Sequence, residues 1–134
     1  MLKDIPELVV EDIALAIVKE KNEEDEEEWN VYFLNLKNKP VEGVLVSSNG
    51  YGEINGEKRK TSTLRHFLDV VDAISYSKIE PIMENVFGLS NEYWVSFFLD
   101  GKMYDKKYVF LPESIRKENY TTIPLLKKKG IMIK

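Results

Sequence analysis

His66 is the side chain best suited to acid–base chemistry, because it is the only histidine in the 134-residue chain. A Ser-His-Asp site would have to use it. The serine could be Ser47 or Ser62, and the acid could be Asp69 or Asp72. No G-x-S-x-G motif places a serine on a strained turn. We therefore expect a protein that is not an enzyme, with a ligand or catalytic pocket near His66 as the alternative.

Two other segments contain residue types that bind ions. Carboxylates crowd the run Glu23–Glu28, but it lacks the Asp-x-Asp-x-Asp-Gly spacing that wraps calcium, and a solvated loop is expected. The glycine-rich stretch from Gly50 is not a phosphate-binding loop, since Gly56 is followed by Glu57 rather than lysine. Without cysteine, thiolate chemistry and cysteine metal sites are excluded. We predict no cofactor and no metal.

The charge pattern bears on the class of partner. A net charge of −4 argues against a general nucleic-acid binder. The short basic clusters Lys58–Lys60 and Lys127–Lys129 leave a weak nucleic-acid accessory role as a further alternative. Acids prevail over residues 1–28 and bases over 113–134, so the two ends can attract each other within or between molecules.

The chain shows neither a signal peptide nor an apolar run near the roughly 20 residues that cross a bilayer. These observations predict a cytoplasmic protein without membrane attachment.

The elements that would position these residues are mostly strands. The run Glu92 to Leu111 has two aromatic and β-branched halves around Asp100-Gly101, a pair that favours the tight turn of a β-hairpin. Asn55-Gly56 gives a second such turn, with Glu53 facing Lys58. The expected strands are residues 8–19, 29–36, 41–48, 60–67, 75–82, both halves of 92–111, and a closing strand at 130–134.

No alternation of strands with helices is visible, so a single all-β domain over residues 1–134 is expected. About eight strands favour an antiparallel β-sandwich, immunoglobulin-like in a loose sense, with a small barrel as the alternative. Residues 64–74 also fit a helical stripe, and we expect a strand to about Phe67, then a loop or one helical turn.

The register of the 92–111 hairpin suggests a functional surface. A two-residue turn places Tyr93, Val95 and Phe97 on one face, which we expect to be buried. With this register, the large apolar side chains of Trp94, Phe98 and Met103 point outward. They form a candidate protein-binding or self-association site, unless a loop or a chain terminus covers them.

A resemblance covers nearly the whole chain. It rests on three stretches, VEGVLVSSNGYGEINGEKRKTSTLRHF, NEYWVSFFLDGKMYDKKYVFLPESI and NYTTIPLLKKKGIMI, which together resemble a family of short uncharacterised bacterial proteins. Some members are labelled phenylalanine–tRNA synthetase α subunit. Class II synthetases have an Arg-x-Glu motif and a late Gly-rich Glu-Arg motif. Only Arg116 has glutamate two residues later, in an expected turn, so the resemblance implies no aminoacylation activity.

Overall fold

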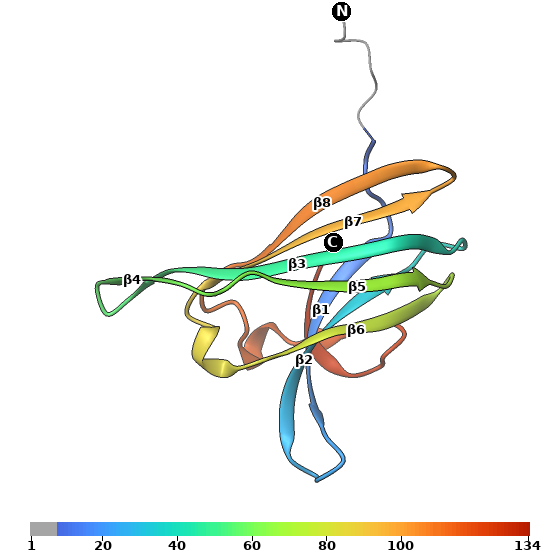
Figure 1. Cartoon of the computed structure of the whole chain (residues 1–134). Helices are drawn as coiled ribbons and strands as arrows, with labels where there is room; N and C mark the ends of the chain where they lie inside the picture. Colours follow the sequence, from blue (N-terminus) through green and yellow to red (C-terminus); the bar gives the residue numbers. More distant parts are fainter. Residues whose placement is uncertain (1–7) are drawn as a thin grey trace, which may run out of the picture.

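The computed structural model describes residues 8–134 and arranges them in two antiparallel sheets of five strands each (Figure 1). Buried apolar side chains from both sheets meet in one layer between them. The predicted all-β antiparallel sandwich is therefore confirmed. Residues 8–134 form ten strands rather than eight, because one expected strand is split in two and the short strand Thr121–Thr122 was not anticipated.

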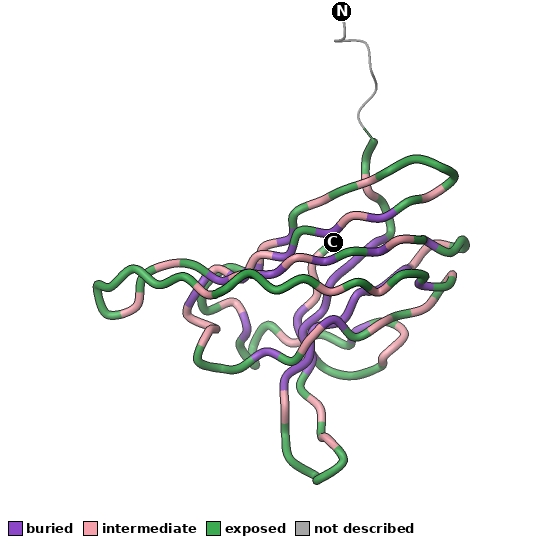
Figure 2. Tube along the Cα trace, in the orientation of Figure 1, coloured by how far each residue is buried: buried purple, intermediate pink, exposed green. Residues whose placement is uncertain are grey.

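The first sheet, called sheet A, has the strand order β6-β2-β1-β10-β9. Its central strand β1 is buried on both faces: Leu15 faces the layer between the sheets, whereas Ala16 faces a second apolar cluster. The C-terminal segment supplies Ile123 to that cluster, and Figure 2 shows how buried residues concentrate along the β1-β2 pair. The strands of sheet A are β1 (Ile13–Lys21), β2 (Glu27–Asn35), β6 (Ser75–Ile82), β9 (Thr121–Thr122) and β10 (Lys129–Ile133).

The second sheet, sheet B, is organised around the 14-residue strand β3. One side of β3 pairs with β7, which in turn pairs with β8; the other side pairs with β4 and β5 in succession. The strands of sheet B are β3 (Val41–Ile54), β4 (Glu57–Lys60), β5 (Leu64–Val71), β7 (Ser90–Leu99) and β8 (Lys102–Phe110), and the short helices are η1 (Glu84–Val86) and η2 (Lys117–Asn119).

The β7-β8 hairpin has the predicted turn and register. Asp100 and Gly101 have φ values of 53° and 75°, the left-handed region that a tight hairpin turn requires. Phe97 lies opposite Tyr104 and Phe98 opposite Met103. Because local turn chemistry sets this register, the two faces of the hairpin follow from it directly.

The prediction for residues 60–67 is wrong in its bounds. β4 ends at Lys60 and a new strand, β5, begins at Leu64, after an interruption in which Thr61 bonds to Gly50. β5 then continues to Val71, so residues 68–71 are strand rather than loop or helical turn. Residues 64–71 form a strand despite their helical periodicity, because they pair with the side of β3 that β7 does not occupy.

The first predicted strand is also shifted. It begins at Ile13 rather than Leu8, since Asp12 has a φ of 56°, which ends extended backbone there. Val9, which lies before this strand, is 68% exposed.

Candidate functional site

Glu80 is a carboxylate placed between the two sheets by an irregularity in its own strand. The pairing of β2 with β6 shifts where Val31 lies opposite Glu80 and Tyr32 opposite Lys78, which leaves Ile79 as an extra residue. This β-bulge turns Glu80 to the inner face, on the same side as Ile82. Only 11% of the Glu80 side chain is exposed.

Three strands of sheet B supply hydrogen bonds to this carboxylate. Ser48 Oγ on β3 donates to Oε1 across 2.7 Å, and His66 Nε2 on β5 lies 2.7 Å from the same oxygen. Tyr93 Oη on β7 donates to Oε2 across 3.2 Å. Because a buried carboxylate is costly unless its lone pairs are satisfied, these contacts explain how Glu80 is tolerated between the sheets.

The arrangement differs from a nucleophilic triad. In a triad the histidine lies between the nucleophile and the acid. Here Ser48 and His66 both bond to the same oxygen of Glu80, so the acid lies between serine and histidine. Burial and the Glu80 charge both raise the pKa of Tyr93 well above its usual value, so its hydroxyl remains a neutral donor. In this cluster, then, no histidine lies between a serine and an acid, and its polar groups all converge on Glu80.

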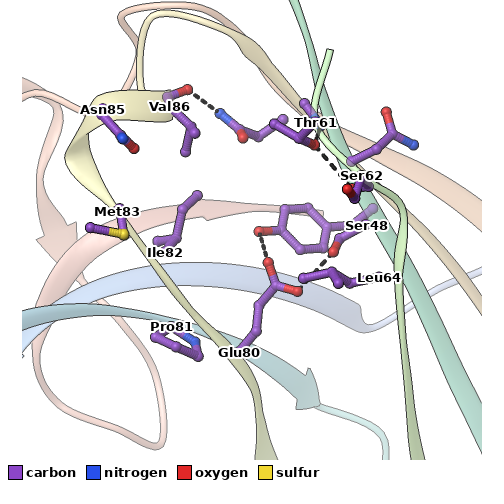
Figure 3. Close-up of a pocket in the computed structure, with 14 residues that line it drawn as sticks. Ser48, Thr61, Ser62, Leu64, Glu80, Pro81, Ile82, Met83, Asn85 and Val86 are labelled. Atoms are coloured by element: carbon purple, nitrogen blue, oxygen red, sulfur yellow. Dashed lines mark hydrogen bonds between the residues drawn. The ribbon is translucent and has the colours of Figure 1, made fainter.

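Glu80 also lines a cleft of about 280 Å³ between β3 of sheet B and the end of β6 (Figure 3). One wall comes from β3 and the β4–β5 connection, with Ser62 and Leu64. The other comes from the end of β6 and from η1, with Met83 at its rim. We call this hollow the Glu80 cleft; it is lined by Ser48, Asn49, Gly50, Thr61, Ser62, Leu64, Glu80, Pro81, Ile82, Met83, Asn85, Val86, Asn91 and Tyr93.

The serine and aspartate candidates for the alternative, a site built on His66, do not contact it in the structure. Ser47 lies between Arg65 and Trp94 in the ladder and, unlike its buried neighbour Ser48, is on the outer side of β3. Ser62 lines the cleft without a hydrogen bond from its side chain to His66.

Asp69 and Asp72 are exposed and lie toward the far end of β5 from the cleft. The acid beside His66 is Glu80, which the sequence analysis did not identify. The sequence contains one signal for it: the apolar residues Ile79 and Ile82 are three positions apart, which breaks the period-two alternation of a strand and indicates a bulge.

A second candidate site is the outer face of sheet B. Trp94, Phe98 and Met103 are 48%, 47% and 55% exposed, as the hairpin register predicts. Two further apolar side chains from β3 and β5, Leu45 at 38% and Phe67 at 67% exposed, lie side by side on the same face. We call these five residues the aromatic face.

Charged side chains border the aromatic face in adjacent rows of the ladder. Trp94 lies in a row with Ser47, flanked by Arg65 on one side and Lys107 on the other. The next row runs from Phe67 through Leu45 and Ser96 to Asp105. Lys107 also contacts Glu92 across 3.3 Å.

The remaining charged clusters lie elsewhere. Glu23–Glu28 span the β1–β2 turn and the start of β2, and no group of three or more potential ligands within residues 8–134 is arranged to hold a metal ion. Lys58–Lys60 lie on β4 of sheet B, which extends away from the rest of the molecule in Figure 1. Lys127 and Lys128 precede β10 of sheet A and Lys129 is its first residue; Lys128 pairs with Glu20. The two basic clusters are thus on different sheets.

Comparison with protein-family models, curated proteins and solved structures finds no match for this chain. The bacterial family and the immunoglobulin-like character expected from the sequence therefore stay predictions. Among residues 8–134, no helix has the length and apolar content needed to cross a membrane.

Proposed function

We propose that this protein is a non-enzymatic interaction module that self-associates through the aromatic face. The observation that carries this proposal is the exposure of five large apolar side chains in neighbouring ladder positions on one side of sheet B. Contiguous apolar surface of this kind is uncommon on monomers and is typical of interaction sites. The ring of Phe98 lies over Gly43, where an added Cβ would be 3.1 Å from it.

A second copy of the chain suits this face because its border charges are self-complementary. Consider a two-fold axis that crosses the strands between the Trp94 row and the Ser96 row. If this axis lies in the plane between the two stacked faces, each strand packs on the same strand of the second copy. A residue of the Trp94 row then faces the residue of the Ser96 row on that strand. Lys107 faces Asp105, and Arg65 faces the ring of Phe67, an arrangement that favours ion pairing and cation–π contact.

The apolar centre would supply most of the free energy of association. Apolar burial contributes about 25 cal/mol per Å², whereas exposed ion pairs contribute about 0–1 kcal/mol. The charges instead select the register and exclude partners with the wrong pattern. Loss of the aromatic side chains should therefore abolish association, while a charge reversal should only weaken it.

Sedimentation velocity over a concentration series tests the proposal. The wild-type protein should show a monomer–dimer equilibrium, and the double variant Trp94→Ser, Phe98→Ser should remain monomeric with an unchanged free energy of unfolding. The matched control is Met83→Ser with Leu111→Ser, which removes two exposed apolar side chains from other surfaces and should leave the dimer intact.

A charge exchange tests the orientation of the two copies. Lys107→Glu should weaken the dimer, and adding Asp105→Lys to it should restore association, because the pair is then reversed in both copies. A wild-type protein that stays monomeric up to millimolar concentration would overturn the proposal. Dimers that survive loss of both aromatic residues would do the same.

A further inference from the structure

The Glu80 cleft lies on the other side of sheet B from the aromatic face. The Glu80 cleft opens between the sheets, and its lining residues on β3 and β7 include Ser48 and Tyr93, which are buried. Trp94, the neighbour of Tyr93, points to the outer face instead. The two sites therefore use opposite sides of the same strands and do not overlap.

The charge of the cleft is set by one residue. Among the described residues that line it, Glu80 is the single ionisable side chain apart from Tyr93, whose hydroxyl stays neutral. No lysine or arginine belongs to that lining. His66 contacts Glu80 from β5 but is not itself part of the wall. The lining therefore presents a carboxylate to a cation and has no lysine or arginine that could receive an anion.

The carboxylate of Glu80 can accept one more hydrogen bond. A carboxylate offers about two acceptor sites on each oxygen. Oε1 is engaged by both Ser48 and His66, whereas Oε2 accepts only from Tyr93, across 3.2 Å. The remaining capacity is thus on Oε2, and a hydrogen bond from a charged donor to it would be stronger than one from a neutral donor.

The walls around the carboxylate are largely apolar. Leu64 stands on one side and Pro81, Ile82 and Met83 on the other, with Glu80 between them (Figure 3). The amide of Asn91 is already used, because it donates to the carbonyl oxygens of Val86 and Leu89 and so holds η1 in place. The part of the cleft next to Glu80 therefore combines apolar side chains with one carboxylate.

We propose that the Glu80 cleft binds a small primary ammonium compound with a short apolar body. The ammonium group donates to Oε2 of Glu80, and the apolar body lies between Leu64 and Met83. A volume of about 280 Å³ is at the lower end of small-molecule sites, so the ligand is an arylalkyl or alkyl amine rather than a large cofactor.

Three probes of similar shape but different charge separate the effect of charge on binding from the effect of shape. We choose 2-phenylethylamine, which is a cation at pH 7, its neutral analogue 2-phenylethanol, and the anion 3-phenylpropanoate. Amide resonances followed by NMR should shift for Ser48, Ser62, Leu64, Met83 and Asn85 on addition of the cation. Binding of the alcohol should be weaker by about tenfold, as expected for loss of a charge-assisted hydrogen bond, and the anion should leave these resonances unchanged.

Two variants, each with a matched control, test whether Glu80 selects the amine over the alcohol. Glu80→Gln should abolish the preference for the amine over the alcohol, whereas Glu42→Gln, which removes the same charge from an exposed position on β3, should keep it. Met83→Arg places a permanent cation at the exposed rim and should displace the amine even if Glu80→Gln does not fold, with Met83→Gln as its control.

Equal binding of the amine and the alcohol would overturn the proposal, because the carboxylate would then not select the ligand. Shifts confined to residues outside the cleft would overturn it as well. So would a Met83→Arg variant that binds the amine as tightly as the wild-type protein does.

Discussion

Tyr93, on an inner strand of sheet B, donates a hydrogen bond to Glu80, on the edge strand of sheet A, across 3.2 Å. Together with Ser48 and His66, this contact ties three strands of sheet B to β6 through a single carboxylate. Elsewhere the two sheets are held mainly by apolar packing, which is not directional, together with hydrogen bonds from Tyr108 Oη to the carbonyl oxygen of Ile13 and from the Asn35 amide to that of Val71. Glu80 thus adds a specific contact that fixes how the sheet edges lie at the mouth of the cleft.

Replacement of Tyr93 by phenylalanine should cost about 1–2 kcal/mol of unfolding free energy, because a hydrogen bond to a charged group is lost and part of Glu80 is left unsatisfied. Urea unfolding measures this cost. A double-mutant cycle with Glu80→Gln should give a coupling energy of about 1 kcal/mol. The control Tyr51→Phe removes an exposed hydroxyl and should change little. Equal effects of the two tyrosine variants would contradict the cross-sheet contact.

Gly130 should tolerate no side chain, because β10 approaches β1 very closely there. An added Cβ would lie within 3.0 Å of Val18 Cα and would overlap the backbone oxygen of Ile17. Gly130→Ala should therefore destabilise the protein by about 3 kcal/mol, at the upper end of overpacking costs.

Thermal and urea unfolding provide the measurement for Gly130→Ala. Gly88→Ala is the matched control, since the nearest atom to its Cβ would be the flexible carboxylate of Glu113 at 3.4 Å. A Gly130→Ala protein as stable as the control would show that β10 can move away from β1.

Local chemistry made the β7-β8 hairpin predictable. The Asp100-Gly101 pair fixes the turn, the turn fixes the register, and the register fixes the exposure of Trp94 and Phe98. Each step depends on residues that are neighbours in the chain or across one turn.

The Glu80 cluster could not be predicted in the same way. Ser48 is 32 residues from Glu80 along the chain, and the contact depends on how two sheets pack. The bulge at Ile79 reverses the face on which Glu80 would otherwise lie, and sequence alternation alone gives the opposite answer. The interruption before Leu64 was missed for a related reason, because Thr61 turns to bond Gly50 on β3.

Acid should weaken the protein partly through Glu20. Burial acts to raise the pKa of this carboxyl, but hydrogen bonds from Lys128, Tyr32 and Asn30 outweigh it, so the pKa in the folded protein lies below its usual value. A lowered pKa stabilises the fold above the unfolded value of about 4.3, and this contribution is lost as the pH falls through the folded pKa.

Urea unfolding of the wild type and of Glu20→Gln from pH 7 to pH 3 tests whether the pKa of Glu20 is lowered in the folded protein. The wild type should have the larger free energy of unfolding at neutral pH, and this difference should shrink as the pH falls. In a Lys128→Met background the difference at neutral pH should be smaller, because one hydrogen-bond donor to Glu20 is removed. A gap of constant size across this range would contradict the assignment.

Trp94 should report association of the aromatic face by its fluorescence. Trp29 is 7% exposed and Trp94 is 48% exposed, so the two tryptophans of the chain have opposite environments. In Trp29→Phe, the emission of Trp94 should be red-shifted and readily quenched by acrylamide at low concentration. As the concentration rises, burial against a second copy should shift the emission to the blue and reduce quenching. The matched control is Trp94→Phe, in which the emission of Trp29 should not depend on concentration. Trp94 emission that stays red-shifted at a concentration where sedimentation detects dimers would place the interface on another surface.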